Sequence, residues 1–230
     1  MNISVQEVCY GSPHIRHLGA RQPLRALCRA LEPPGRRALS GLAGHPGRAA
    51  LFAGGATAIA LEDAAVDVVV SGLVLNFVPD PPAALAEMAR VAGPDGTIAA
   101  YVWDYAGKME LMRLFWDAAV ELDPAAAALD EGRRFPLCRP EALGRLFAAA
   151  GLGGVATEAI DIATPFADFD DYWQPFLGGQ GPAPAYALAL DEAARERLRE
   201  RLRARLPIAA DGSIALTARA WAVRGTAAPA

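Results

Sequence analysis

The chain has 230 residues, a formal net charge of -4, 53% hydrophobic residues and 21% charged residues, as expected of an ordinary globular protein with one sizeable core. Neither sign of charge is in large excess, so no broad basic surface for nucleic acid is indicated. The sequence also lacks the run of roughly 20 apolar residues that a membrane span requires and the apolar core of a secretory signal. We therefore expect a protein that binds neither nucleic acid nor membrane.

The cysteines are odd in number and far apart, and the nearby histidines match no established spacing of metal ligands, so neither a disulfide framework nor a metal site is indicated. These residues are Cys9, Cys28, Cys138, His14 and His17. Lys108 is the only lysine among many arginines, a bias of GC-rich coding. We expect a bacterial, cytoplasmic protein. An organelle transit peptide would share the Arg-rich, acid-poor composition of residues 1–50, but prolines interrupt any long amphipathic helix there.

In chain order, the first regular pattern begins at Asp67. Val68 to Val70 predict a strand buried on both faces, and the spacing of apolar residues predicts a helix over 81–91. Pro94, Asp95 and Gly96 predict a turn, and residues 97–103 a second strand of the same buried type. Strand, helix and strand within about 35 residues form a βαβ unit, which predicts a parallel sheet.

Further helices are predicted over 109–122 and from Pro140 to the glycines near 151, and further strands over 154–163 and 213–223. Residues 168–186, DFDDYWQPFLGGQGPAPAY, predict a Gly/Pro-rich aromatic loop. The helix over 191–206 carries a leucine stripe among Arg and Glu. We interpret it as a surface helix packed by its leucines, and a nucleic-acid face as the alternative.

Two predicted strands end in contrasting residues. Ser71 and Gly72 end the first, and Trp103, Asp104 and Tyr105 follow the second. Ligands of doubly wound sheets bind beyond the carboxyl ends of the parallel strands. Small side chains at one strand end and large ones at the next predict a slot with an aromatic wall there, whereas the simpler interpretation of Ser-Gly is a turn.

The run VDVVVSGLVLNFVPDPPAALAEMARVAGPDGTIAAYVWDY, residues 66–105, resembles the second half of class I S-adenosylmethionine-dependent methyltransferases of the small-molecule, type 11-like kind. In that family a strand, a small-residue loop, a helix, a P-G-G-like turn and a strand follow in this order. A looser likeness covers about residues 50–225. The resemblance implies an α/β, Rossmann-like fold whose C-terminal strand is antiparallel, S-adenosylmethionine as cofactor, and methyl transfer to a small molecule.

The resemblance also implies positions for the cofactor. Upstream, LFAGGATAIALEDAAVD is similar to the family segment that ends the third strand, where an aspartate accepts a hydrogen bond from the adenine; here Gly55 takes its place. The small-residue loop matches the part of the family that lies near the methionine portion, where small residues permit close approach. The implied cofactor-binding residues are Gly54, Gly55, Ala56, Ser71, Gly72 and Leu73.

Candidates for acceptor contact surround these positions. Asn76 and Phe77 stand where relatives often carry His or an aromatic residue near the transferred methyl group. Asp104 is a weak catalytic candidate, with a turn carboxylate as the alternative, because direct displacement from a sulfonium requires no obligatory catalytic residue. The aromatic candidates either contact the substrate or pack on the core. They are Trp103, Tyr105 and Trp173.

The front of the chain departs from the family. The expected acid and G-x-G-x-G loop are absent, and EVCYGSP supplies only Gly11. We expect residues 1–47 to form an atypical, poorly ordered segment, and 48–230 a methyltransferase-like domain in which 168–206 insert an aromatic loop and a surface helix. Apolar and polar residues alternate over Ile3 to Cys9, so this segment is predicted to replace the missing first strand of the family beside Val68–Val70.

Two explanations fit the altered front: a frameshift, or a diverged protein. Two functions follow as well: an active methyltransferase, or a catalytically inactive remnant that lacks the cofactor loop. A nucleotide-binding dehydrogenase is less supported, since it requires a similar glycine loop. No feature of the sequence selects an oligomeric state or a particular methyl acceptor.

Overall fold

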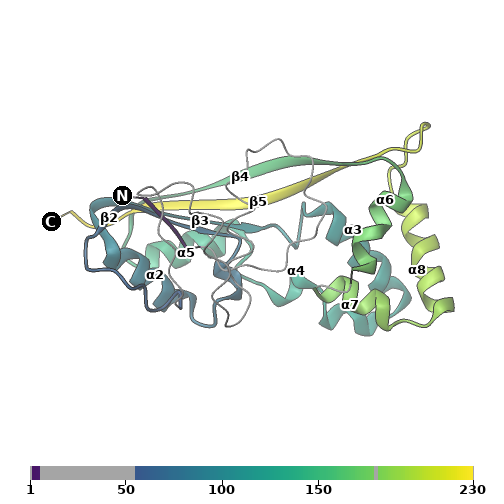
Figure 1. The fold of residues 1–230 in the computed structure, drawn as a ribbon, viewed down its shortest axis with the longest axis horizontal. Coiled ribbons are helices and arrows are strands. Elements are labelled where there is room, and N and C mark those ends of the chain that lie inside the picture. The colour runs from purple at the N-terminus through teal and green to yellow at the C-terminus, as the bar shows by residue number, and fades with distance from the viewer. Residues whose placement is uncertain (1, 6–54, 179–180, 230) are drawn as a thin grey trace, which may run out of the picture. The chain divides into compact units, whose positions relative to one another are not determined.

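The computed structural model describes residues 2–5, 55–178 and 181–229 (Figure 1). The chain forms two compact units. Unit 1 comprises Met1–Tyr101, Leu146–Ala156 and Arg224–Ala230, and unit 2 comprises Val102–Arg145 and Thr157–Val223. The expected domain boundary near residue 48 lies outside the described residues.

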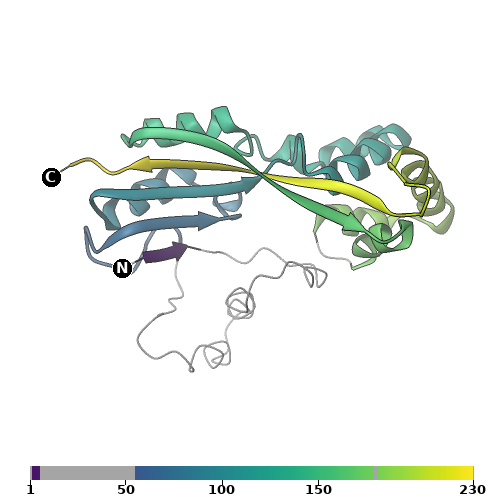
Figure 2. The same cartoon turned by 90° about the horizontal axis from the view of Figure 1, so that it is seen from above.

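Five strands form one sheet in the order β1-β2-β3-β5-β4. Their bounds are Asn2–Val5 for β1, Val66–Gly72 for β2, Ala92–Trp103 for β3, Gly153–Phe166 for β4 and Ile214–Thr226 for β5. β1, β2 and β3 pair in parallel, whereas β5 runs in the opposite direction to its neighbours (Figure 2). This arrangement confirms the α/β, Rossmann-like fold class with an antiparallel C-terminal strand.

β1, at one edge of the sheet, provides the neighbour of β2 that the altered front of the sequence left in doubt. Its residues pair with β2 from Asn2 opposite Val68 to Val5 opposite Ser71. Of the replacement strand predicted over Ile3 to Cys9, the part up to Val5 is confirmed, and the rest lies outside the described residues. β2 thus has hydrogen-bonded neighbours on both sides, and its backbone avoids the cost of about 1 to 3 kcal/mol per unsatisfied buried group.

The two strands of the βαβ unit are fully buried on one face, not on both. In β2, Val69 is buried while Val68 and Val70 are only partly buried. In β3, Ile98, Ala100 and Val102 are buried and alternate with partly buried residues. Predicting two-sided burial from a run of valines overlooked this period-2 pattern.

The helix between these strands, α2, spans Pro81–Val91, as the sequence predicts. The carboxylate of Asp80 accepts a hydrogen bond from the Ala83 N–H at 3.0 Å, and prolines occupy the first turn, where no intrahelical donor is needed. Ala84, Leu85, Met88 and Val91 are buried.

The turn predicted at Pro94 to Gly96 lies inside β3 as an irregularity of the ladder. Val66 pairs with Ala92 and Val68 with Thr97, so four residues of β3 stand opposite one of β2. Asp95 has a φ of 59°, a left-handed conformation that Asp tolerates better than most side chains. The turn chemistry was therefore recognised, but the strand continues through it.

The helices outside the βαβ unit are mostly in unit 2. Their bounds are Glu110–Leu122 for α3, Pro124–Ala128 for η3, Glu131–Arg134 for α4, Pro140–Ala149 for α5, Phe169–Trp173 for α6, Gln174–Leu177 for η4, Pro182–Ala189 for α7 and Glu192–Arg205 for α8. A further 3-10 helix, η2 (Leu75–Phe77), follows β2 in unit 1.

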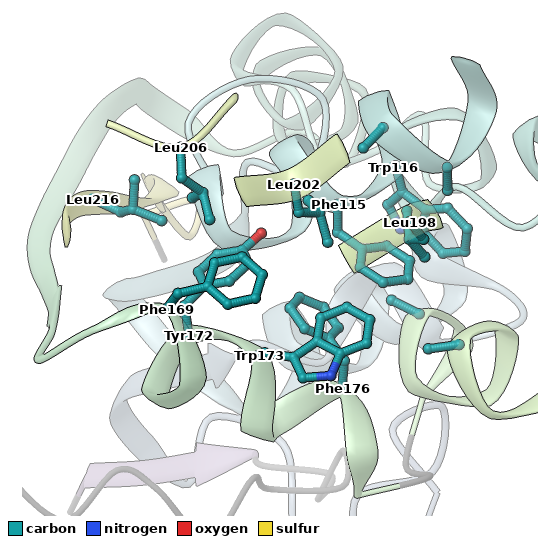
Figure 3. Close-up of a cluster of buried hydrophobic side chains, with 14 of the residues drawn as sticks. Phe115, Trp116, Phe169, Tyr172, Trp173, Phe176, Leu198, Leu202, Leu206 and Leu216 are labelled. Atoms are coloured by element: carbon teal, nitrogen blue, oxygen red, sulfur yellow. The ribbon is translucent and has the colours of Figure 1, made fainter. Parts of the chain in front are cut away.

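The aromatic stretch predicted as a loop forms α6, η4 and α7 instead, and its rings fill the core of unit 2 (Figure 3). Phe176 stacks on Phe115 with 4.4 Å between ring centroids, and the Tyr172 hydroxyl donates to the Leu111 carbonyl at 3.2 Å. Asp168 caps α6 by accepting from the Asp171 N–H at 2.9 Å. Gly and Pro here punctuate short helices, which composition alone does not distinguish from a loop.

α8 is a surface helix held by its leucines, as predicted. Leu198 and Leu202 are buried in the core of unit 2. The basic residues pair with acids instead of forming a free cationic face: Arg199 lies 2.7 Å from Asp170, and Arg201 and Arg205 both pair with Glu121.

Replacing Leu202 by Ala should lower the free energy of unfolding by about 2 to 5 kcal/mol, because a fully buried leucine leaves a cavity behind. Leu188→Ala is the matched control, since Leu188 on α7 is 44% exposed and its truncation should cost far less. Chemical denaturation of both variants measures the difference. Equal losses would mean that the α8 leucines do not pack the core of unit 2.

Candidate functional site

The carboxyl end of β2 is the candidate site of unit 1. Ser71 and Gly72 are the last residues of β2, and both are buried. The next residue, Leu73, has a φ of 59°, and its N–H donates to the Tyr101 carbonyl at 2.8 Å. A left-handed leucine is strained, at a cost of about 1 kcal/mol or more, and such strain concentrates at functional sites.

Gly72 pairs directly with Tyr101 of β3, and the tyrosine ring lies over the glycine. A Cβ built on Gly72 would lie 2.4 Å from the Tyr101 hydroxyl oxygen and 2.8 Å from Cζ. An aromatic ring over a cross-strand glycine is a known way to compensate for the missing side chain. Gly72 therefore has a packing reason to be small, and the space on its side-chain face is taken by Tyr101.

We call the carboxyl end of β2 and the residues that follow it the Gly72 rim. η2 begins in this rim, two residues after Leu73, and carries a buried polar atom that lacks a hydrogen-bond partner among the described residues. The side-chain Nδ2 of Asn76 is buried and has no hydrogen-bond partner among the described residues. The helix is fixed by the Phe77 N–H, which donates to the Val74 carbonyl at 2.8 Å, and by the buried Leu75. The Phe77 side chain is 37% exposed.

The segment matched to the adenine side of the site follows Gly55 and Ala56, and α2 holds it in place. Gly54 lies outside the described residues. The Arg90 guanidinium donates to the carbonyls of Ile59 and Leu61, both at 2.9 Å. The Glu87 carboxylate accepts from the Ile59 N–H at 2.9 Å. The loop therefore has a fixed path beside α2, although Gly55 itself is exposed.

Arg90 and its two carboxylate partners form a compact charged group. Arg90 lies 2.6 Å from Glu87 and 2.6 Å from Asp63. The hydrogen bond from Arg90 lowers the pKa of the Glu87 carboxyl, and the hydrogen bonds to Glu87 and Asp63 raise the pKa of Arg90. Both groups therefore stay charged through the neutral range, which preserves the attachment of the loop.

A separate group of candidate residues follows β3 in unit 2. The carboxylate of Asp104 accepts from the Lys108 N–H at 2.9 Å, and its carbonyl accepts from the Met109 N–H at 3.0 Å. A Cβ on Gly107 would lie 2.5 Å from an Asp104 carboxylate oxygen. Asp104, which is 7% exposed, thus has the geometry of a turn carboxylate.

The aromatic candidates are divided between the strand end and the helical core of unit 2. Trp103 ends β3 and is partly buried, and the Tyr105 ring lies 5.8 Å from that of Phe135. Trp173 is 6% exposed and packs at 5.8 Å from Phe176 in the aromatic core (Figure 3). Within unit 2, therefore, only the first two lie beside the strand end.

Unit 2 also contains a buried ionic cluster that the sequence analysis missed. Arg113 donates to both carboxylate oxygens of Asp130, at 3.0 and 2.8 Å. Glu131 is 4% exposed, and its carboxylate accepts from the Trp116 indole N–H. A Cβ on Gly132 would lie 2.8 Å from an Arg113 nitrogen, so a glycine is needed beside the two acids. The run Asp-Glu-Gly at residues 130–132 was therefore the feature of the sequence that could have indicated this cluster.

Burial raises the pKa of one carboxyl and one thiol in unit 2. Desolvation raises the pKa of the Glu131 carboxyl, and the charge of Asp130 adds to this. Desolvation, with a smaller contribution from Asp104, raises the pKa of Cys138 to about 12. The Cys138 thiol is therefore un-ionised at neutral pH and is not a nucleophile.

A cavity of about 340 Å³ opens at the other end of the sheet in unit 1. It is lined mainly by small apolar residues before β2, at the start of β3 and after α5, so it lies away from the Gly72 rim. Among the described residues there is no cluster of three or more His, Cys, Asp or Glu that could hold a metal ion. None of the helices in the described ranges is long and apolar enough to cross a membrane.

Replacing Gly72 by Val tests the aromatic pairing at the rim. Valine favours strands, but its Cβ would meet the Tyr101 ring, so we expect a loss of about 1 to 3 kcal/mol in the free energy of unfolding. In a Tyr101→Ala background the same substitution should be neutral or stabilising. A double-mutant cycle by denaturation measures the coupling; equal effects in both backgrounds would show that Tyr101 does not restrict Gly72.

Replacing Glu131 by Gln tests the buried carboxyl. Because burial raises the folded-state pKa above the ordinary 4.5, the protonated form stabilises the fold fully below pH 4.5, and this contribution is lost as the pH rises through the folded-state pKa. Glutamine keeps an oxygen for Trp116 without the charge. Denaturation from pH 4 to 8 should show the variant gaining stability relative to the wild type as the pH rises, and a stability difference that does not change with pH would contradict this.

Comparisons with known proteins find similarity to methyltransferases. A family model described as a methyltransferase domain matches residues 20–100. This match begins inside the stretch 1–47, which was expected to be atypical, and ends within β3. The likeness found in the sequence covers about residues 50–225, so the two ranges overlap only in part. No curated protein matches the chain.

Solved structures with similar coordinates include three bacterial proteins. A candidate methyltransferase from Bacillus halodurans C-125 has 11% identity and a TM-score of 0.43, with 76% of each chain covered. The YcgJ protein from Bacillus subtilis has 15% identity and a TM-score of 0.42, covering 77% of this chain and 70% of that one. A candidate methyltransferase from an antibiotic biosynthesis pathway of Anabaena variabilis has 22% identity and a TM-score of 0.42, covering 74% and 71%.

The family model extends over the βαβ unit on which the resemblance was first read, namely β2, α2 and most of β3. The resemblance to the methyltransferase family is thereby confirmed over this unit.

Proposed function

We propose that the chain binds S-adenosylmethionine and transfers its methyl group to a small-molecule acceptor, in the bacterial cytoplasm that its composition suggests. The observation that carries this proposal is the methyltransferase-domain match over residues 20–100. The parallel strands β1, β2 and β3 support it, because ligands of such sheets bind beyond the carboxyl ends of the strands.

The rim residues fit a bound cofactor in one specific respect. The Nδ2 of Asn76 is a buried donor without a partner among the described residues, and a buried donor of this kind calls for an acceptor. Ser71, Leu73 and Asn76 would hold the cofactor at the end of β2. Gly55 and Ala56 would lie on its adenine side, in the loop that Arg90 holds against α2.

When bound, the cofactor supplies an electrophilic methyl group on a sulfonium, and the protein contributes binding, alignment and exclusion of water. Phe77, Trp103 and Tyr105 are the side chains that we propose for acceptor contact. Asp104 is a positioning residue in this proposal, because its carboxylate already accepts from the Lys108 N–H. Trp173, packed in the aromatic core, is not required.

A catalytically inactive remnant is the second candidate. Gly55 provides no carboxylate where the family accepts a hydrogen bond from the adenine, and the glycine loop of the family is absent from the sequence. Tyr101 also fills the side-chain face of Gly72. These features reduce the polar contacts available to the cofactor, and a protein without measurable affinity would fit them.

Titration with S-adenosylmethionine separates the two candidates. A ligand that binds only the folded protein stabilises it by about 2.7 kcal/mol at a hundredfold excess over its dissociation constant, so thermal unfolding should shift upward with ligand concentration. ATP at the same concentrations is the control, since it carries adenine and ribose without the sulfonium. No shift with millimolar S-adenosylmethionine would favour the remnant.

A positive titration should be followed by transfer from methyl-labelled cofactor. With bacterial extract separated by size, the label should appear in the small-molecule fraction. Labelling confined to the protein or nucleic-acid fraction would contradict the proposed class of acceptor.

A further inference from the structure

Asn76 is the only side-chain donor besides Ser71 between residues 71 and 78, and no Lys or Arg occurs from residue 71 to residue 89. An anionic group at this rim would therefore have to be met by neutral donors from this stretch of the chain. Asn76 is partly exposed as a residue, yet its Nδ2 is buried and without a partner in the described structure. The side chain is thus close to the surface while its donor is unused.

The position of Asn76 is fixed by its surroundings. β2 ends at Gly72, Leu73 turns sharply in a left-handed conformation, and η2 follows at once. Val74 and Leu75, between Leu73 and Asn76, are each 1% exposed. Backbone strain at Leu73 and an unpaired donor at Asn76 are independent observations within four residues, and both are typical of binding sites.

A carboxylate is the acceptor that best fits such a donor. Hydrogen bonds to ionised groups are shorter and about twice as strong as those between neutral groups. Of the polar groups that S-adenosylmethionine and S-adenosylhomocysteine carry, the amino-acid carboxylate is the one anion. The remaining acceptors are hydroxyl and ring oxygens and adenine nitrogens, which are neutral.

Resting on the proposed function, we infer that the Asn76 side-chain amide donates a hydrogen bond to the carboxylate of the cofactor's amino-acid portion. Asn76 is then a binding residue, and its unpaired state in the free protein is a stability cost that ligand binding removes. Two consequences of opposite sign follow for substitutions that remove the donor: the free protein becomes more stable, and the cofactor binds more weakly.

The test compares Asn76→Leu, which keeps the shape of the side chain, with Asn76→Asp, which places a charge opposite the carboxylate. Calorimetry should show S-adenosylhomocysteine binding to Asn76→Leu about tenfold more weakly than to the wild type, and to Asn76→Asp more weakly still. Thermal unfolding of ligand-free Asn76→Leu should occur at or above the wild-type temperature. Gln174→Leu, an amide-to-leucine change at an exposed position of η4, should alter neither quantity.

A second ligand locates the contact within the cofactor. Methylthioadenosine lacks the amino-acid portion, so wild type and Asn76→Leu should bind it equally. Equal weakening for both ligands would place the donor against the nucleoside and overturn the carboxylate assignment. Unchanged affinity for S-adenosylhomocysteine in Asn76→Leu would overturn the inference but not the proposed function, whereas absence of binding to the wild type would overturn the proposed function.

Discussion

The parallel pairing of β2 on both of its sides is the constraint on which the rest of unit 1 depends. β1 and β3 fix its register from Asn2 opposite Val68 to Gly72 opposite Tyr101. Because parallel strands end at the same edge, the chain leaves β2 and β3 on one side of the sheet. The rim at Gly72 is a consequence of this register, and a shift by one residue would exchange the buried and partly buried faces of β2.

α2 extends that constraint to the loop after Gly55, which we propose for the adenine side of the cofactor. One guanidinium, that of Arg90, reaches two loop carbonyls and two carboxylates, which only the planar, five-donor arginine fork can do. Since α2 itself packs against β2, the loop after Gly55 and the rim at Gly72 are both positioned by the same helix and strand. A site composed of separate segments thus acquires a fixed geometry without a metal or a disulfide.

Local patterns predicted what depends on neighbours in sequence. The bounds of α2 follow from the Asp80 cap, the prolines after it and the apolar period, all of which lie between Asp80 and Val91. The aromatic stretch from Asp168 was mispredicted because its Gly and Pro indicate a loop locally, while the burial of Tyr172 and Phe176 depends on α3 and α8. β2 ends at Gly72, where the sequence predicted it to end, but the packing of Tyr101 over Gly72 depends on the register between strands.

Two features of the Gly72 rim, the left-handed leucine and the unpaired amide, lower the stability of the fold. A left-handed leucine costs about 1 kcal/mol or more, and an unpaired buried amide about 1 to 3 kcal/mol, a substantial part of a typical total of 5 to 15 kcal/mol. Leu75, Leu85 and Val69, each at most 1% exposed, hold the segment in place despite these costs. Packing therefore allows an unpaired hydrogen-bond donor to persist after the carboxyl end of β2. Such a donor can bind a ligand without first breaking a hydrogen bond within the protein.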